Sequence, residues 1–570
     1  MRILTRLNKV IWVGLALLMI LPYKRAASYA ITPADVLASR KEDSPEHQLL
    51  TPAGQGRLLE LINSGALPDL MWPDFTKYRA EMVDFYQSFN GSLPWVRNGE
   101  PTDQARAIIS ILQNAALEGL RPEDYNGVKW NDRIALLRAS PPPSEWDLIH
   151  FDVALTVSTM RYVSDLHLGR VNPRVHHFKL DTEPKTLDLS EFLQLKLVDA
   201  PDVAAAIESL EPPFPAYQRT IMALRRYLDL AQHDRGRTLP VPKTPVKPGE
   251  RYSGVRRLVE LLELTGDMPT GQGADGTTYT AALAESVKVF QRRHGLDVTG
   301  ILDLQTVKQL NVPLAQRVLQ LQLTLERWRW APHGLGRLPI VVNIPGFRLY
   351  AIDRQFHWGL SMKVVVGRAY RHQTPVFAGE MKSIIFRPYW NVPRNIQRNE
   401  LLPQIEKNPL YLEQHSYEVV DQNESVVVDG DVKEGLRSGK LRIRQKPGPD
   451  NALGLIKFDL PNAYDVYMHD TPAKELFSRS RRDFSHGCIR VENPVALAAW
   501  VLQDRPEWTV EHILSAMNGN ETLRITLKQS IPVLIVYGTA VVMEDGEVHF
   551  FNDIYGHDKA LEQGLAESHP

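Results

Sequence analysis

The hydrophobic periodicity of this chain changes near its middle, and the change requires two kinds of domain. From residue 56 to about residue 232, apolar residues recur at helical spacing, as in the run from Ala105 to Ala116. From Leu338 onward the period falls to two, as in IVVNIPGFRLYAI, which is typical of β-strands. A chain of 570 residues is also longer than one hydrophobic core usually serves. The sequence therefore predicts a multidomain α+β protein.

A proline-rich segment divides the helical half. Residues 235–250 read RGRTLPVPKTPVKPGE, with four prolines, and such a run favours an extended spacer. Before it, residues 31–234 are predicted to form a helical scaffold domain, in which no catalytic constellation is evident. After it, residues 251–312 are predicted to form a compact unit of three helices, and residues 313–337 a connecting helix.

The strand pattern of the second half is interrupted. Residues 338–542 form the predicted β domain, but between residues 394 and 447 the alternation is lost, and it resumes only at Leu453–Asp459. The insertion directly precedes the segment that contains Cys488, the candidate site described below, and we therefore expect it to be a lid. A surface insertion without a role is the alternative. Residues 543–570 remain as a C-terminal extension.

The first thirty residues have the order of a secretory signal. Basic residues precede an apolar run from Val10 to Leu21, and Ser28-Tyr29-Ala30 offers small residues for cleavage. The run is shorter than the roughly 20 residues that span a bilayer, so we expect cleavage and a periplasmic protein, with an uncleaved inner-membrane anchor as the alternative. Cleavage removes five basic and no acidic residues, which moves the formal charge from −1 to −6 and argues against a nucleic-acid partner.

The chain has one cysteine, Cys488, so no internal disulfide can form. A lone cysteine is often only a small buried hydrophobe. This one lies in YMHDTPAKELFSRSRRDFSHGCIRVENP, with His469 nineteen positions upstream. A nucleophilic thiol needs a base or a cationic neighbour that lowers its pKa. This segment contains both, and we expect a lowered pKa for Cys488.

The pairing of HDT at residues 469–471 with SHGCIR at residues 485–490 resembles the signature of L,D-transpeptidases of the YkuD type. Val366-Gly367, Thr374-Pro375 and PYWNVP at residues 388–393 support the resemblance. Within residues 251–312, VKVFQRRHGL and TGILDLQTVKQLN resemble a small peptidoglycan-binding domain. The order of the parts resembles the large YcbB branch of the family. One departure is Asp470, where smaller members commonly have glycine.

The resemblance implies a cysteine transpeptidase of peptidoglycan. Cys488 would attack the bond between residue three and D-Ala at position four of a tetrapeptide stem and form a thioester. His469 would act as the general base and acid, oriented by a backbone carbonyl that the sequence does not identify. The backbone N–H groups of Gly487 and Cys488 are the predicted donors to the oxyanion.

Other residues of the motif have two readings each. Arg490 either anchors the strand through a carboxylate or carbonyl or favours the thiolate electrostatically. His486 has either a site role or a structural one. Ser485 either hydrogen-bonds locally or orients His469. Tyr467 is predicted to line the substrate groove, although it could equally pack in the core. Trp390 and Asn391 are predicted groove residues on the neighbouring strand.

The motif does not determine the acceptor of the acyl group. An amine of a second stem would give 3–3 cross-links, which we expect; water would give an L,D-carboxypeptidase, and a lipoprotein lysine an anchored wall protein. The resemblance also implies acylation by carbapenems and a functional link to a D,D-carboxypeptidase, which supplies tetrapeptides. A non-catalytic peptidoglycan-binding protein is the alternative from another class. We expect no cofactor and no metal, because the two histidines and one cysteine are a poor zinc signature.

Overall fold

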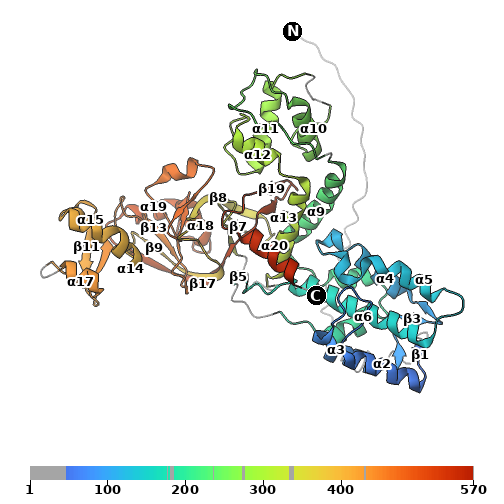
Figure 1. Ribbon diagram of the computed structural model, residues 1–570. Helices are drawn as coiled ribbons and strands as arrows, with labels where there is room; N and C mark the ends of the chain where they lie inside the picture. The colour runs from blue at the N-terminus through green and yellow to red at the C-terminus, as the bar shows by residue number, and fades with distance from the viewer. Residues whose placement is uncertain are drawn as a thin grey trace, which may run out of the picture. The chain divides into compact units, whose positions relative to one another are not determined.

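A computed structural model of the protein describes residues 47–175, 178–179, 185–234, 236–271, 276–332, 339–428 and 432–568 (Figure 1). The predicted secretory signal and the segment that follows it, up to residue 46, lie outside the described residues. In the part that the structure describes, no helix combines the length and the apolar character needed to cross a membrane.

The predicted helical scaffold surrounds one long helix. Helix α6 (Glu145–Leu168) begins with a capping box in which the Ser144 N–H donates to Asp147. Its side chains are buried almost without interruption from Leu148 to Leu166, as expected for a helix at the centre of a bundle. The shorter helices of the same core are α2 (Pro52–Ser64), α3 (Arg79–Ser88), α4 (Asp103–Gln113), α5 (Trp130–Leu137), α7 (Leu189–Phe192) and α8 (Val203–Glu208). Helix α9 (Pro215–His233) packs instead against α13 (Leu314–Arg329) in a separate core.

The described part of residues 251–312 contains three helices with a core of their own: α10 (Val255–Thr265), α11 (Ala281–Arg293) and α12 (Leu304–Leu310). The preceding proline-rich segment is not a free spacer. Leu239 and Val246 are buried in this same core, and the Val246 N–H donates to the Leu302 carbonyl over 3.1 Å. The prediction of a spacer is therefore wrong for Leu239 and Val246, because their apolar side chains are buried in the core of the neighbouring domain.

The second half is built on a sheet that closes on itself. The order of its principal strands is β13-β14-β16-β8-β7-β6-β17-β9-β5, and β13 also pairs with β9. Closure leaves the inner side chains of these strands fully buried, among them Val342, Ile384 and Val533. The strands are β5 (Phe178–Lys179), β6 (Ile340–Asn343), β7 (Arg348–Ile352), β8 (Trp358–Gly367), β9 (Val376–Phe386), β13 (Ile456–Asp459), β14 (Met468–His469), β16 (Ile489–Val491) and β17 (Leu523–Val536). The predicted multidomain α+β fold with a mainly β domain is thus confirmed.

The predicted insertion, residues 394–447, is part of a small subdomain that also includes Trp390, Asn391 and Val392. It forms a separate sheet in the order β10-β12-β11 and has its own apolar core, which includes Val392, Ile405 and Ile443. Its elements are β10 (Trp390–Asn391), α14 (Arg394–Ile396), a π-helical turn (Gln397–Leu401), α15 (Leu402–Lys407), α16 (Tyr411–Gln414), β11 (Tyr417–Val420), α17 (Val432–Ser438) and β12 (Arg442–Gln445). A subdomain with a separate core can keep its shape while it moves.

The C-terminal segment is an integral part of the structure. After β18 (Ala540–Val542) and β19 (Val548–Phe550), the chain ends with α20 (His557–Glu567). Arg327 of the connecting helix α13 (Leu314–Arg329) pairs with Asp558 over 2.6 Å, with both side chains largely buried. The segment therefore joins the β half to the connecting helix.

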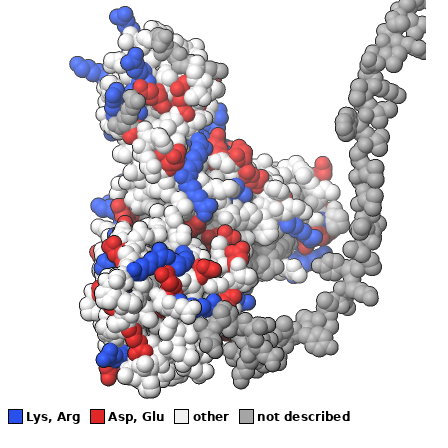
Figure 2. Space-filling view, turned by 90° about the vertical axis from the view of Figure 1, so that its right-hand side faces the viewer, with Lys and Arg blue, Asp and Glu red and all other residues white. Residues whose placement is uncertain are grey.

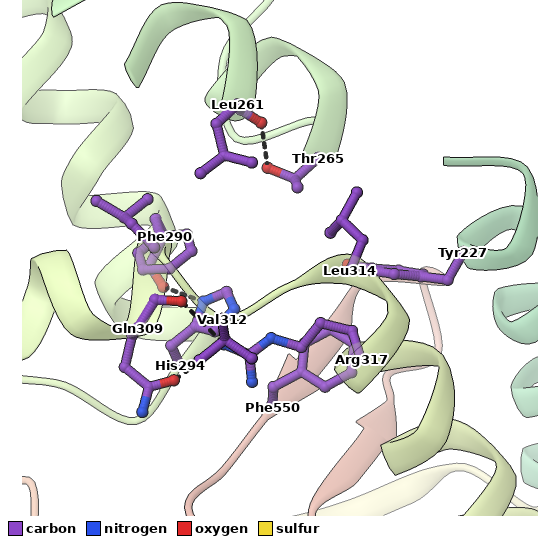
Figure 3. Close-up of a pocket in the computed structure, with 11 residues that line it drawn as sticks. Tyr227, Leu261, Thr265, Phe290, His294, Gln309, Val312, Leu314, Arg317 and Phe550 are labelled. Atoms are coloured by element: carbon purple, nitrogen blue, oxygen red, sulfur yellow. Dashed lines mark hydrogen bonds between the residues drawn. The ribbon is translucent and has the colours of Figure 1, made fainter. Parts of the chain in front are cut away.

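A cavity lies where α11, α12, α13 and β19 meet (Figure 3). Its volume is about 20 Å³, and His294, Arg317 and Phe550 line it. That volume holds about one water molecule, so the cavity cannot receive a peptide or sugar. On the face drawn in Figure 2, acidic and basic side chains are interspersed.

Candidate active site

The register of two short parallel strands brings the predicted residues together. Met468 of β14 lies opposite Ile489 of β16, and His469 lies opposite Arg490. The Ile489 N–H also donates to the Tyr467 carbonyl over 3.0 Å. Side chains alternate between the two faces of a strand, so Tyr467, His469, Cys488 and Arg490 belong to one face.

His469 is held as a neutral base. Its side chain is buried, and Nδ1 lies 2.5 Å from the Asp470 carbonyl. A carbonyl can only accept, so Nδ1 carries the proton and Nε2 keeps its lone pair. Burial, aided by the charge of Arg490, lowers the pKa of His469 to about 3. The orienting carbonyl that the sequence left unidentified is therefore that of Asp470.

Asp470 stabilises this arrangement. Its carboxylate accepts the Leu455 N–H over 3.0 Å and pairs with Lys474 over 2.5 Å. A glycine could make neither contact. The Asp470 side chain thus fixes the backbone that carries the orienting carbonyl.

Cys488 is a neutral thiol in the structure. Its S–H donates to the Asp465 carbonyl over 3.6 Å, and burial raises the pKa of the thiol despite a hydrogen bond from Tyr467 and the charge of Lys457. In the described part of the chain no hydrogen bond joins Cys488 to His469. The expected lowered pKa of Cys488 is therefore not found, because desolvation outweighs the cationic neighbours.

The Tyr467 hydroxyl connects the thiol to the insertion. It donates to the Cys488 sulfur and accepts a hydrogen bond from the Trp390 side chain. Lys457 Nζ lies 4.2 Å from the centre of the Tyr467 ring. Asn391, the third predicted groove residue, is exposed in β10 and has no described contact with these groups.

A tight turn presents Cys488. Gly487 has φ of +117°, a conformation that side chains with a Cβ rarely adopt. The Ser485 hydroxyl accepts from the Gly487 N–H over 3.1 Å and donates to the Cys488 carbonyl over 2.6 Å. Ser485 thus acts inside the turn, not on His469. Of the two predicted oxyanion donors, the Gly487 N–H is already engaged, whereas among the described residues the Cys488 N–H has no acceptor.

A second layer behind the turn contains a residue that the sequence analysis missed. The Thr374 hydroxyl donates to the Gly487 carbonyl over 2.8 Å and accepts from the Gly367 N–H over 2.9 Å. The Tyr555 hydroxyl donates to the Gly367 carbonyl over 2.5 Å and accepts from the Thr374 N–H over 3.2 Å. Tyr555 lies in the C-terminal segment, where no local pattern pointed to the site.

His486 contacts the insertion. Its Nε2 lies 2.7 Å from a carboxylate oxygen of Glu400, in the π-helical turn. The ring of His372 lies 4.8 Å away, centre to centre. His486 thereby connects the turn that carries Cys488 to the insertion.

Among the residues that the structure describes, Arg490 has no anchoring partner. Its Nε is buried without a hydrogen bond, and the guanidinium forms no ion pair with any described residue. Its charge acts on Cys488 and on His469. Among the described residues, no group of three or more His, Cys, Asp or Glu side chains has an arrangement that could hold a metal ion.

Three segments of the chain match known protein families. Residues 339–541 match the model of the L,D-transpeptidase catalytic domain, YkuD. Residues 80–224 match a scaffold domain, and residues 251–310 match a family described as "Putative peptidoglycan binding domain". A protein of Haemophilus influenzae named "Putative L,D-transpeptidase" is 34% identical over 231 residues, which is 40% of this chain. The match covers 46% of the relative, so the chain spans about half the length of that protein.

Proposed function

The chain carries a YkuD-type L,D-transpeptidase catalytic domain together with scaffold and peptidoglycan-binding domains, and on this premise we propose that it forms 3–3 cross-links in peptidoglycan with Cys488 as nucleophile. One observation carries the proposal. A neutral imidazole with a free Nε2, the thiol and an unengaged N–H belong to one short stretch of paired strands.

In the first half-reaction, the Cys488 thiol turns away from the Asp465 carbonyl and transfers its proton to His469 Nε2 as the sulfur attacks the carbonyl of residue three. The oxyanion accepts a hydrogen bond from the Cys488 backbone N–H. When the tetrahedral intermediate collapses, the bond to D-Ala breaks, and His469 returns the proton to the leaving amine. The product is a thioester on Cys488 and free D-alanine.

In the second half-reaction, an amine of a neighbouring stem attacks the thioester. His469 Nε2 takes a proton from this amine, the new amide forms, and the departing sulfur recovers the proton. Because both partners start neutral, a proton transfer accompanies each attack and no resting ion pair is needed. The hydrogen bond from Tyr467 stabilises the sulfur whenever it carries negative charge.

An amine acceptor agrees with the surroundings of the site. The insertion contacts His486 through Glu400 and Tyr467 through Trp390. A subdomain in this place can act as a lid that excludes water, and excluding water favours transfer over hydrolysis. The peptidoglycan-binding domain would hold the polymer that supplies the acceptor.

The test is incubation of the purified protein with sacculi rich in tetrapeptides, followed by mass spectrometry of the muropeptides. We expect 3–3 dimers, and none with the Cys488→Ala variant. Tripeptides without dimers would identify an L,D-carboxypeptidase instead, and products linked to a lipoprotein lysine an anchoring enzyme. If the protein binds sacculi without any product, it is a binding protein.

The same mechanism predicts acylation by a carbapenem, because a strained β-lactam carbonyl can replace the peptide carbonyl. The adduct should be on Cys488, as peptide mapping by mass spectrometry would show. An adduct on another residue contradicts the assignment of the nucleophile. We further propose that residues 1–30 direct export to the periplasm, where a D,D-carboxypeptidase would supply the tetrapeptides.

A further inference from the structure

The guanidinium of Arg490 is half-buried, and no described residue forms an ion pair with it. It lies opposite His469 in the strand register and two residues beyond Cys488, on the same face. Its Nε is buried and unpaired, and the two groups that raise its pKa, Cys488 and the exposed Glu475, form no ion pair with it. A buried N–H without a hydrogen-bond partner, on a cation that is partly withdrawn from water, is costly unless an acceptor compensates it.

A second arginine is hydrogen-bonded to the two residues that lead into the turn of Cys488. Arg368 follows the end of β8, where its N–H donates to the Ser485 carbonyl over 3.1 Å and its Nε to the Phe484 carbonyl over 3.2 Å. Its charge acts on Arg490, and it too forms no ion pair within the described residues. Arg368 is therefore held beside the turn that carries Cys488, and its charge and that of Arg490 repel each other.

Two guanidiniums in this arrangement are suited to a carboxylate, because the planar donors of arginine match its two oxygens. We propose that Arg490 and Arg368 form a subsite for the terminal carboxylate of the donor stem, on the D-alanine that leaves. This proposal rests on the proposed function.

The covalent structure of the donor supports this choice. The terminal carboxylate is separated from the attacked carbonyl by one nitrogen and one α-carbon. Residues two apart on a strand are about 6.6 Å apart, so a carbonyl at Cys488 places this carboxylate within reach of Arg490. In a stem with a fifth residue, an amide would replace the carboxylate at this point. The subsite would thus select stems that end at position four.

The test compares two synthetic stem tetrapeptides that differ only in a terminal carboxylate or carboxamide. We measure kcat/KM for acylation of the full chain by mass spectrometry. The wild type should prefer the carboxylate about 10- to 100-fold, as expected for the loss of charged hydrogen bonds. Arg490→Gln and Arg368→Gln should abolish the preference by raising KM for the carboxylate peptide alone. Arg371→Gln removes an exposed charge from the same loop and should keep the preference.

Equal rates for the two peptides in the wild type would overturn the subsite, as would an equal loss for both peptides in Arg490→Gln, which would indicate a role in stabilising the thiolate. If neither peptide acylates Cys488, the proposed function fails, and equilibrium binding of the two peptides decides the subsite separately. Tighter binding of the carboxylate that is lost in Arg490→Gln supports it, and equal binding contradicts it.

Discussion

The chemistry of the site depends on the protonation of two side chains. His469 is neutral because it is buried and its Nδ1–H is used by the Asp470 carbonyl, and Cys488 is a thiol because burial disfavours its charge. The motif predicted which residues meet, but its prediction of a lowered pKa for Cys488 was wrong. Desolvation depends on how the surrounding strands close, and the identity of the residues does not determine that.

The acid side of the pH profile tests this state of His469. Because the pKa of His469 is lowered to about 3, the imidazole remains a base at every pH well above that value. We expect kcat/KM for acylation to show no loss from His469 protonation between pH 7 and pH 5. An exposed imidazole, with a pKa near 6.5, would lose about 95% of its base form over this range. A loss of kcat/KM of this size would contradict the assignment. The control is the reaction of the same peptide with a small thiol that is already ionised, which should show no such loss.

The hydroxyl of Ser485 offers a second test. Ser485→Ala removes the bridge between the Gly487 N–H and the Cys488 carbonyl, so the turn loses its internal support. We expect kcat for acylation to fall about tenfold, the equivalent of one hydrogen bond of average strength. Ser485→Thr keeps the hydroxyl and should restore most of the activity. If Ser485→Ala is fully active, the bridge has no part in presenting the thiol.

At the scale of elements, the layer behind the turn involves strands and loops distant in sequence. Tyr555 holds Gly367 and Thr374, and Thr374 holds Gly487. Tyr555→Phe removes both contacts of its hydroxyl and should lower kcat about 5- to 30-fold with KM unchanged, given about 1 to 2 kcal/mol for the lost hydrogen bonds. Tyr370→Phe, on a fully exposed side chain, is the matched control. A change in KM alone would contradict a positioning role.

Helix α6 carries a buried carboxylate with a measurable consequence. Burial raises the pKa of Asp152 to about 7, although its oxygens accept from Tyr86 and the Trp95 N–H. Between pH 4 and pH 7, Asp152 is protonated in the folded protein but ionised in the unfolded chain. The contribution of this proton to the free energy of unfolding is therefore present at low pH and is lost as the pH rises through 7. In Asp152→Asn, the melting temperature should depend less on pH between 5 and 8. An unchanged pH dependence would refute the raised pKa.

At the scale of the whole chain, a buried ion pair supports the peptidoglycan-binding domain where it contacts the C-terminal segment. Arg293 binds Asp267 over 2.7 Å and donates to the Val548 carbonyl over 2.9 Å. Asp267→Asn leaves a buried cation without its partner and should reduce the free energy of unfolding by about 3 kcal/mol. Glu285→Gln, which breaks the exposed pair with Lys288, should cost less than about 1 kcal/mol. Denaturant titration of both variants checks this, and equal losses would contradict it.

Periodicity was sufficient to predict the helical half and the β half, because each has a continuous local pattern, and the insertion, because the strand pattern is lost there. It failed for residues 235–250, where Leu239 and Val246 enter a core that a proline-rich composition does not indicate. Within the site, the strand register that joins His469 to Arg490 and the contact of Tyr555 are long-range. No local signal in the sequence could have revealed either.

The central claim is that His469 activates Cys488 for acylation. The most direct measurement is intact-protein mass spectrometry of the wild type, Cys488→Ala and His469→Gln, each mixed rapidly with a stem tetrapeptide. We predict that the wild type gains the mass of the tripeptide acyl group on Cys488, that Cys488→Ala gains none, and that His469→Gln gains it at least about 100-fold more slowly. Acylation of His469→Gln at the wild-type rate, or of Cys488→Ala at any rate, would contradict the claim.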